Sequence, residues 1–272
     1  MLTWMLTLAF ASAPSSAALG ADMRPDRESQ LPKQLVGVGI DEAIDVQVPT
    51  DLTFTNQDGQ TVTLGSLFER GKPTVLTLNY TNCPLLCNVQ LSGFVNAMRA
   101  IEDDLGDIFN VITVSIDPKD DFKRAKQVLN RYEDDYGRPI GEHWQYLVGT
   151  EKEIEAVTKA VGFGYHLDTE TGEYQHTSAL IVLSPEGKVS RYLYGVTYSP
   201  NTLRLTTIEA AEGKSASSLD QLILYCFKYD SKQGQYTPVV RNIMQLGAAV
   251  TVLLLGLLAG GAWLRKPTSS AE

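Results

Sequence analysis

The sequence predicts an α/β domain, and three observations indicate this class. Residues 73–80 and 109–116 are continuous apolar runs of the length expected for buried strands. Each run is followed by a segment with apolar side chains at helical spacing, residues 90–101 and 121–132 respectively. Residues 179–194 contain two further strand-like runs around a Pro-Glu-Gly turn, as in an antiparallel hairpin. We therefore expect a sheet packed against helices.

The segment before the first long strand predicts a short hairpin. Residues 54–62 carry Asp58-Gly59 near their centre, and Asp-Gly is a favoured turn between antiparallel strands. The strands and helices described above follow this hairpin. The second helix, at 121–132, opens with acidic side chains, which are favourable at a helix N-terminus.

The second half of the chain continues the alternation of strands and helices. The predicted elements are a strand at 144–148, a helix at 151–161 ended by Gly162, strands at 179–184 and 188–194, and a helix at 200–213. Strand, helix, strand, helix and then hairpin and helix is the order of a thioredoxin-like fold, here with an N-terminal hairpin extension. In that order the first helix carries the reactive cysteines at its N-terminus.

The size and charge of the chain limit its function. The chain has 272 residues, and the segment 50–215 is long enough for one domain with a sizeable core. The formal net charge is -9, and the sequence has no basic stripe. We therefore expect no nucleic-acid partner.

The segment before the predicted domain indicates export. Residues 1–20 are uncharged and apolar or small, which predicts a signal peptide even though the usual positively charged start is missing. Residues 21–49 are polar and punctuated by prolines, which is typical of a linker.

The segment after the domain predicts a membrane anchor. Residues 216–242 are expected to connect the domain to an apolar run at 246–264, whose length is close to the roughly 20 residues that span a bilayer. We therefore expect one transmembrane helix at 243–264. Basic residues open the tail at 265–272, which places that tail in the cytoplasm and the domain on the periplasmic side of the cell membrane.

Cys83 and Cys87 are the most chemically informative residues. They follow the strand at 73–80 with the spacing of one helical turn. Because the thiolate binds metals and attacks disulfides, and a helix N-terminus lowers thiol pKa, the pair can bind a soft metal or exchange a disulfide. A zinc site would need two more such ligands, and the sequence offers one further cysteine, Cys226, and three histidines. Two sulfurs and one imidazole suit Cu(I) better.

The histidines His143, His166 and His176 are candidates for the imidazole. His176 precedes the strand at 179–184, and in a thioredoxin-like order that loop approaches the N-terminus of the first helix. We take His176 as the candidate ligand, although a loop histidine is more often solvated. His143 and His166 lack this placement and are expected to be structural or solvated. We expect Cys226 to be a buried apolar residue.

These residues, in this order, resemble the Sco/SenC family of membrane-anchored copper-binding proteins. The resemblance covers about residues 50–210. It is carried by the CxxxC motif of Cys83 and Cys87 after a strand, the strand end Ser115-Ile116-Asp117-Pro118, and His176 followed by Thr-Ser, an apolar strand and Ser184-Pro185-Glu186-Gly187.

The resemblance implies a thioredoxin-like fold and a Cu(I)/Cu(II) site made by Cys83, Cys87 and His176. It also implies a metallochaperone that matures the dinuclear copper centre of cytochrome c oxidase by delivering copper or by reducing the cysteines of that centre, so that a thiol-disulfide reductase activity stays open. The partner would be the copper-bearing subunit of the oxidase or another copper protein. Asp117 would either help partner binding or cap the turn that follows its strand.

Two features depart from the family's pattern. Members often read CPxxCP with an acidic residue inside the loop, whereas this loop has Leu85, Leu86 and Asn88. The loop is therefore less charged, which bears on copper affinity and partner choice. Many members are also tethered by an N-terminal helix, while here a C-terminal helix is expected.

Two other functions stay open on the residues alone. One is a thiol-disulfide oxidoreductase with Cys83 as nucleophile and Cys87 as resolving thiol. A peroxidase is a more distant form of this idea, because Tyr80 stands where peroxiredoxin-type sites place a threonine. The other is an interaction domain whose cysteines form a structural disulfide, as cysteine pairs outside the cytoplasm often do. Closing so small a loop would add only about 2 kcal/mol of stability.

Overall fold

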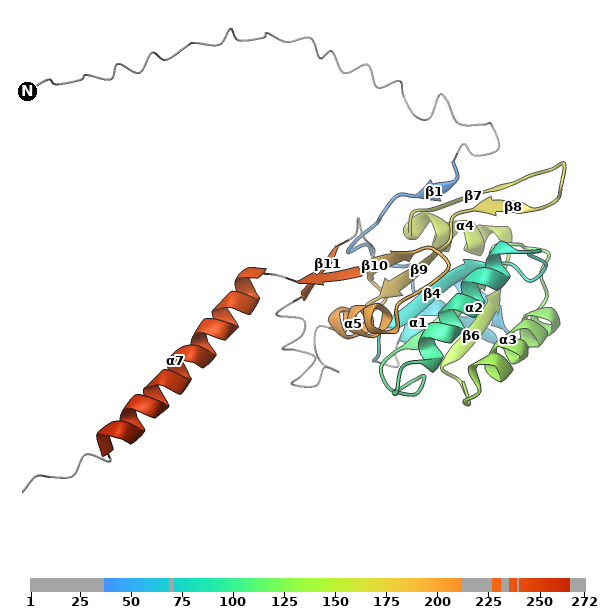
Figure 1. The fold of residues 1–272 in the computed structure, drawn as a ribbon. Coiled ribbons are helices and arrows are strands. Elements are labelled where there is room, and N and C mark those ends of the chain that lie inside the picture. Colours follow the sequence, from blue (N-terminus) through green and yellow to red (C-terminus); the bar gives the residue numbers. More distant parts are fainter. Residues whose placement is uncertain (1–36, 69–70, 212–226, 231–234, 239, 265–272) are drawn as a thin grey trace, which may run out of the picture.

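The computed structural model describes residues 37–68, 71–211, 227–230, 235–238 and 240–264. Its centre is a seven-stranded mixed sheet with the order β10-β9-β4-β5-β6-β2-β3 (Figure 1). In chain order these strands are β2 (Thr53–Asn56), β3 (Thr61–Thr63), β4 (Thr74–Asn79), β5 (Asn110–Ser115), β6 (Trp144–Val148), β9 (Ala179–Leu183) and β10 (Val189–Tyr194).

The strands predicted at 73–80 and 109–116 are confirmed as the middle of the sheet. β4 pairs with β5 in parallel, from Thr74 opposite Asn110 to Asn79 opposite Ser115, and β5 pairs in parallel with β6. All residues of these strands are buried. Because both faces of such strands are covered, the sequence shows continuous apolar runs instead of alternation.

Helices cover both faces of the sheet (Figure 1). They are α1 (Leu64–Phe68), α2 (Leu86–Arg99), α3 (Phe122–Tyr136), α4 (Glu151–Ala160) and α5 (Pro200–Ala210). α2, α3 and α5 pack on one face in a hydrophobic cluster that includes Val75, and α1 and α4 pack on the other in a cluster that includes Leu76. Neighbouring residues of β4 thus enter opposite cores, as the alternation of a strand requires.

Local signals in the sequence set the ends of two elements. The Asp121 side chain accepts a hydrogen bond from the N–H of Arg124 and caps α3, and Gly137 ends that helix in a left-handed conformation with φ 71. Gly59 has φ 77 in the turn between β2 and β3, which confirms the predicted hairpin. The hairpin is part of the main sheet, because β2 also pairs with β6.

A second, three-stranded antiparallel sheet was not predicted. It consists of β1 (Gly39–Ile40), β7 (Phe163–Leu167) and β8 (Tyr174–His176) in the order β1-β7-β8. Its last strand ends at the candidate ligand His176. The approach of His176 to the cysteines therefore depends on a β-hairpin and not on a loop alone.

Residues 45–48, inside the predicted linker, contact the start of β10. Gln47 forms a bridge with Lys188, and Val48 is fully buried. The N–H of Val48 donates to the carbonyl of Gly187 at 3.0 Å, and the N–H of Val189 donates to the carbonyl of Val46 at 2.9 Å. This segment thus belongs structurally to the domain.

The α/β, thioredoxin-like part of the predicted fold is confirmed. The chain follows the expected order, with β4, α2, β5 and α3 in succession and the antiparallel pair β9 and β10 before α5. α2 starts directly after the cysteine loop that follows β4. The two candidate cysteine ligands therefore follow the end of β4.

The predicted transmembrane helix at 243–264 is wrong. The described residues near the C-terminus form an antiparallel pair, β11 (Phe227–Asp230) and β12 (Gln235–Pro238), and then α7 (Val240–Leu264). In the described part of the chain, no helix combines the length and the apolar character that crossing a membrane requires.

Several predictions fall on residues that the structure does not describe. They are the signal peptide at 1–20, part of the linker at 21–49, part of the connector at 216–242 with Cys226, and the tail at 265–272. The division of the chain into these segments stays a prediction.

Candidate metal centre

Cys83 and Cys87 lie on either side of the start of α2. β4 ends at Asn79 and α2 begins at Leu86, so Cys83 lies in the loop and Cys87 in the first turn of the helix. The N–H of Cys87 donates to Cys83 Sγ at 3.2 Å, and the Asn88 amide donates to the Cys83 carbonyl at 3.2 Å. The loop therefore folds the Cys83 sulfur over the unpaired N–H groups of the helix.

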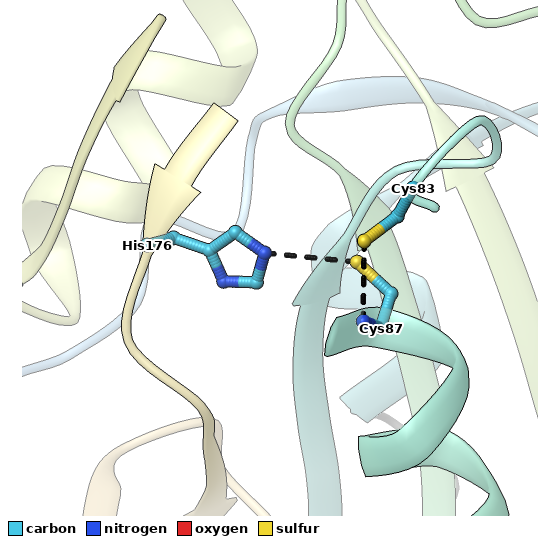
Figure 2. A group of neighbouring side chains, drawn as sticks. All are labelled: Cys83, Cys87 and His176. Atoms are coloured by element: carbon cyan, nitrogen blue, oxygen red, sulfur yellow. Dashed lines mark hydrogen bonds between the residues drawn. The ribbon is translucent and has the colours of Figure 1, made fainter. Parts of the chain in front are cut away.

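His176 reaches the cysteines from β8, and Figure 2 shows its ring pointing at the two sulfurs. His176 Nε2 lies 3.6 Å from Cys87 Sγ. His176 Nδ1 lies 3.1 Å from the carbonyl oxygen of Thr177, and a carbonyl can only accept a hydrogen bond. Nδ1 therefore carries a proton, and Nε2 is the ring nitrogen that faces the sulfurs.

The three side chains are close together and shielded from water. One ligand atom from each of Cys83, Cys87 and His176 lies within 4.8 Å of the others. The residues are 7 %, 3 % and 8 % exposed, respectively. Aromatic rings surround the imidazole, with the Tyr80 centroid at 6.2 Å and the Phe163 centroid at 5.8 Å. A soft, dry donor set of this kind suits a soft metal ion.

The two thiols have opposite pKa shifts. The pKa of Cys83 is lowered to about 4, because the Cys87 thiol, the His176 ring and the N–H groups of Cys87 and Leu85 hydrogen-bond to its sulfur, although burial opposes the shift. The pKa of Cys87 is raised, because its thiol is engaged with Cys83, is buried and lies beside the Cys83 negative charge. The pair thus holds one proton, with Cys83 as the thiolate.

The donor set fits Cu(I) better than a structural zinc ion. Within the described residues, the group of histidine, cysteine and acidic side chains close enough to hold a metal consists of Cys83, Cys87 and His176. Both cysteines are free thiols. Two sulfurs and one nitrogen leave a tetrahedral zinc site one ligand short, whereas Cu(I) favours soft thiolate ligands.

The other candidate residues do not join this group. His143 Nδ1 lies 3.0 Å from the Asn110 side-chain oxygen, which gives His143 a structural role. His166 is exposed on β7. Asp117 accepts a hydrogen bond from the N–H of Lys119 at 2.9 Å, which caps the turn after β5.

A pocket of about 350 Å³ opens directly onto the site. Cys83 and His176 line it together with Tyr80, Tyr174, the polar residues Glu173 and Gln175, and the apolar residues Pro84, Leu85, Leu86, Val89 and Val196. Leu85 is 69 % exposed at its rim. The pocket gives a metal ion, or the ligands of a partner protein, a route to the sulfurs.

Sequence reasoning did not identify two groups that shape the site. They are the carbonyl of Thr177, which sets the tautomer of His176, and the carboxylate of Asp120, which accepts hydrogen bonds from the cysteine loop. A carbonyl has no sequence signature. Asp120 was detectable only as an acidic residue after a strand, a position that caps a turn in most proteins.

Comparison with known proteins identifies the family. The model of the SCO1/SenC family matches residues 42–209. A curated relative is "Protein SCO1 homolog 1, mitochondrial" from Arabidopsis thaliana, which is 27 % identical over 154 residues, 56 % of this chain and 43 % of the relative. The match thus spans less than half of that relative's length.

Solved structures share the fold. A candidate electron transfer protein from Aquifex aeolicus VF5 is 26 % identical, with a TM-score of 0.56, and the match covers 64 % of this chain and 96 % of that one. A SCO1/SenC family lipoprotein from Bacillus anthracis has a TM-score of 0.52 at 21 % identity, with 64 % and 99 % covered. Copper-bound ScoI from Arabidopsis thaliana has a TM-score of 0.50 at 22 % identity, with 61 % and 99 % covered. Because the family model spans more than half of the chain, this protein belongs to the SCO1/SenC family.

Proposed function

We propose that this protein is a copper metallochaperone that binds one copper ion through Cys83, Cys87 and His176. The observation that carries the proposal is the convergence of two sulfurs and an imidazole nitrogen within 4.8 Å beneath an open pocket. Membership of the SCO1/SenC family supports it, and a family structure from Arabidopsis thaliana is described with copper bound.

The residues suit the uptake and release of copper. Cys83 is already a thiolate, so it can bind an incoming Cu(I) without first losing a proton. Cys87 must lose its proton when the metal binds, and copper uptake therefore releases a proton. Aromatic and aliphatic side chains make up most of the lining of the pocket, which would admit the ligands of an acceptor.

The proposed destination is the dinuclear copper centre of cytochrome c oxidase, reached through the copper-bearing subunit or another copper protein. This step rests on the family resemblance, and the predicted signal peptide supports a periplasmic location. An acceptor with similar soft ligands could take the ion ligand by ligand, at little cost in free energy.

The test is the copper content of the full chain purified with reduced thiols. We expect one Cu(I) per chain, and a large loss of affinity in Cys83→Ser and His176→Ala. His166→Ala is the matched control, because that histidine is exposed and lies outside the site. Unchanged binding in Cys83→Ser and His176→Ala would show that the ligands are assigned incorrectly.

A second candidate function is thiol-disulfide exchange, which the opposite pKa shifts of the cysteines favour. A thiolate at Cys83 beside a protonated Cys87 is the state from which a nucleophile attacks a disulfide and a resolving thiol follows. In a Cys87→Ser variant given oxidised glutathione, the Cys83 thiolate would attack the glutathione disulfide, release one glutathione thiolate and stay trapped as the mixed disulfide. Equal trapping at Cys87 in Cys83→Ser would argue against these roles.

A further inference from the structure

We propose that Asp120 is a positioning residue that holds the cysteine loop, residues 80–87, in the conformation of the metal site. The effect of Asp120 on copper binding rests on the proposed function, but the positioning role is also tested on metal-free protein. Asp120 lies between β5 and α3, and the loop lies between β4 and α2. The two segments meet at the carboxyl ends of neighbouring parallel strands.

The carboxylate of Asp120 accepts hydrogen bonds from two segments of the chain. Asp120 Oδ2 accepts a hydrogen bond from the N–H of Thr81 at 2.8 Å, and Asp120 Oδ1 accepts one from the Thr81 hydroxyl. The hydroxyl of Ser115, at the end of β5, donates to Asp120 Oδ2. Thr81 lies two positions before Cys83. Asp120 thus joins the entrance of the cysteine loop to the sheet.

The loop needs such a connection because its backbone-to-backbone hydrogen bonds are local. The Cys83 N–H donates to the Tyr80 carbonyl at 3.4 Å, and the Cys83 carbonyl accepts from Asn88 at 3.2 Å. These bonds shape the turn but do not fix it against β5. Hydrogen bonds to a charged acceptor are stronger than neutral ones, so Asp120 is well suited to fix it.

The same turn also touches the hairpin that carries His176. Asp117, three positions before Asp120, accepts a hydrogen bond at 3.4 Å from the hydroxyl of Tyr174, which is in β8. The turn from Asp117 to Asp120 therefore contacts both the cysteine loop and β8, the strand that carries His176. The contacts of Asp120 with the loop are the shorter ones.

The first measurement is amide hydrogen exchange on the full chain, metal-free and reduced. Asp120→Ala removes every acceptor, so we expect exchange in residues 80–88 to become about 10-fold to about 100-fold faster, as the loss of charged hydrogen bonds implies. Alkylation of Cys83 should also accelerate, while exchange in β9 and α4 stays unchanged. Asp120→Asn should restore much of the protection lost in Asp120→Ala, because its oxygen still accepts from Thr81 N–H and Ser115 and its amide can donate to the Thr81 hydroxyl, although the charge is lost.

Asp121→Ala is the matched control, since it removes the same charge one position away and uncaps α3. Exchange in residues 80–88 that is the same in Asp120→Ala as in this control would overturn the proposal. So would faster exchange across the whole sheet, or failure of Asp120→Asn to restore the loop.

The second measurement is the absorption band of Cu(II) bound to thiolate, which should change in Asp120→Ala and return in Asp120→Asn. An unchanged band in Asp120→Ala would contradict the positioning role. A wild-type protein that binds no copper would contradict the proposed function instead, and the hydrogen-exchange result would still decide the role of Asp120.

Discussion

At the residue scale, the chemistry of His176 depends on a neighbouring backbone atom. The carbonyl of Thr177 accepts a hydrogen bond from Nδ1, and this contact leaves Nε2 free to face Cys87. A backbone acceptor cannot be removed by point substitution, so the tautomer is protected against mutation. The sequence identifies the histidine, but the tautomer follows from the conformation of the chain after β8.

The low pKa of Cys83 predicts an unusual pH profile for alkylation of the metal-free protein. The rate should rise as the pH passes about 4 and then stay nearly flat, because the thiolate is already formed, whereas an ordinary thiol gains reactivity up to its pKa near 9.0. The lowered pKa of Cys83 also contributes to the stability of the fold. This contribution is fully present above the pKa of Cys83 in the unfolded chain, near 9.0, and is lost as the pH falls through about 4.

The measurement is the rate of iodoacetamide addition at Cys83, read by peptide mass spectrometry between about pH 4 and about pH 9. Cys87 serves as the internal control, because its raised pKa keeps it protonated over this range. A Cys83 rate that keeps rising toward pH 9 would contradict the assignment of the thiolate.

A buried hydroxyl between two strands gives a second residue-scale prediction. Thr113 accepts hydrogen bonds from the hydroxyl of Thr77 at 2.8 Å and from the indole N–H of Trp144 at 3.0 Å. Thr113→Val keeps the shape but leaves the indole N–H without a partner, so it should destabilise the protein by about 1–3 kcal/mol. Urea unfolding measures this change.

Thr206→Val is the matched control for that substitution. Thr206 is fully buried, and its hydroxyl has no hydrogen-bond partner among the described residues. Its removal should therefore leave stability unchanged or raise it. Equal losses in both variants would show that the hydrogen bonds of Thr113 contribute little.

At the scale of elements, local pattern predicted the central strands and failed for β7 and β8. β4 and β5 are uniformly buried, so their apolar runs are visible without knowledge of their partners. β7 is short, half-exposed and contains Gly164, β8 has three residues, and the other partner of β7, β1, lies far earlier in the chain. Short strands without a fully buried face carry a weak local signal.

The close approach of α2 to the loop after β10 predicts that Gly93→Ala destabilises the protein. A Cβ at Gly93 would lie 1.9 Å from the backbone carbonyl oxygen of Val196, so the helix or the loop must move. Overpacking of this kind costs about 1–3 kcal/mol, which exceeds the gain of up to about 1 kcal/mol in helix propensity. Urea unfolding is again the measurement.

Ser92→Ala is the control for Gly93→Ala, because Ser92 is the exposed preceding residue of the same helix. It should be neutral or slightly stabilising. Since Val196 lines the pocket over the site, Gly93→Ala should also alter that pocket. A Gly93→Ala variant as stable as wild type would mean that the loop after β10 can move aside without loss of stability.

At the scale of the whole molecule, the site depends on long-range assembly. Cys87 and His176 are 89 positions apart in the chain and meet only when the three-stranded sheet docks at the end of β4. The sequence named the three candidate ligands through their residue types and the family motif. It could not supply their distances, the tautomer of His176 or the role of Asp120, because these follow from packing between distant segments.

Copper binding should stabilise the whole fold, because the donor set is assembled only in the folded state. A ligand that binds only the folded state adds about 2.7 kcal/mol when its free concentration is about 100 times its Kd. We therefore expect Cu(I) to raise the midpoint of thermal unfolding and a Cu(I) chelator to reverse the change. His176→Ala should reduce the shift, and a shift of wild-type size in that variant would contradict the ligand set.

The backbone contacts of residues 45–48 also bear on the solubility of the protein. β10 is an outer strand of the main sheet, and an outer strand with free N–H and carbonyl groups can recruit a strand from another molecule. Val46 and Val48 occupy these groups at Gly187 and Val189, where β10 begins. A chain cut after Val48 would expose that edge and should aggregate, so residues 45–48 protect the start of β10 against aberrant strand pairing.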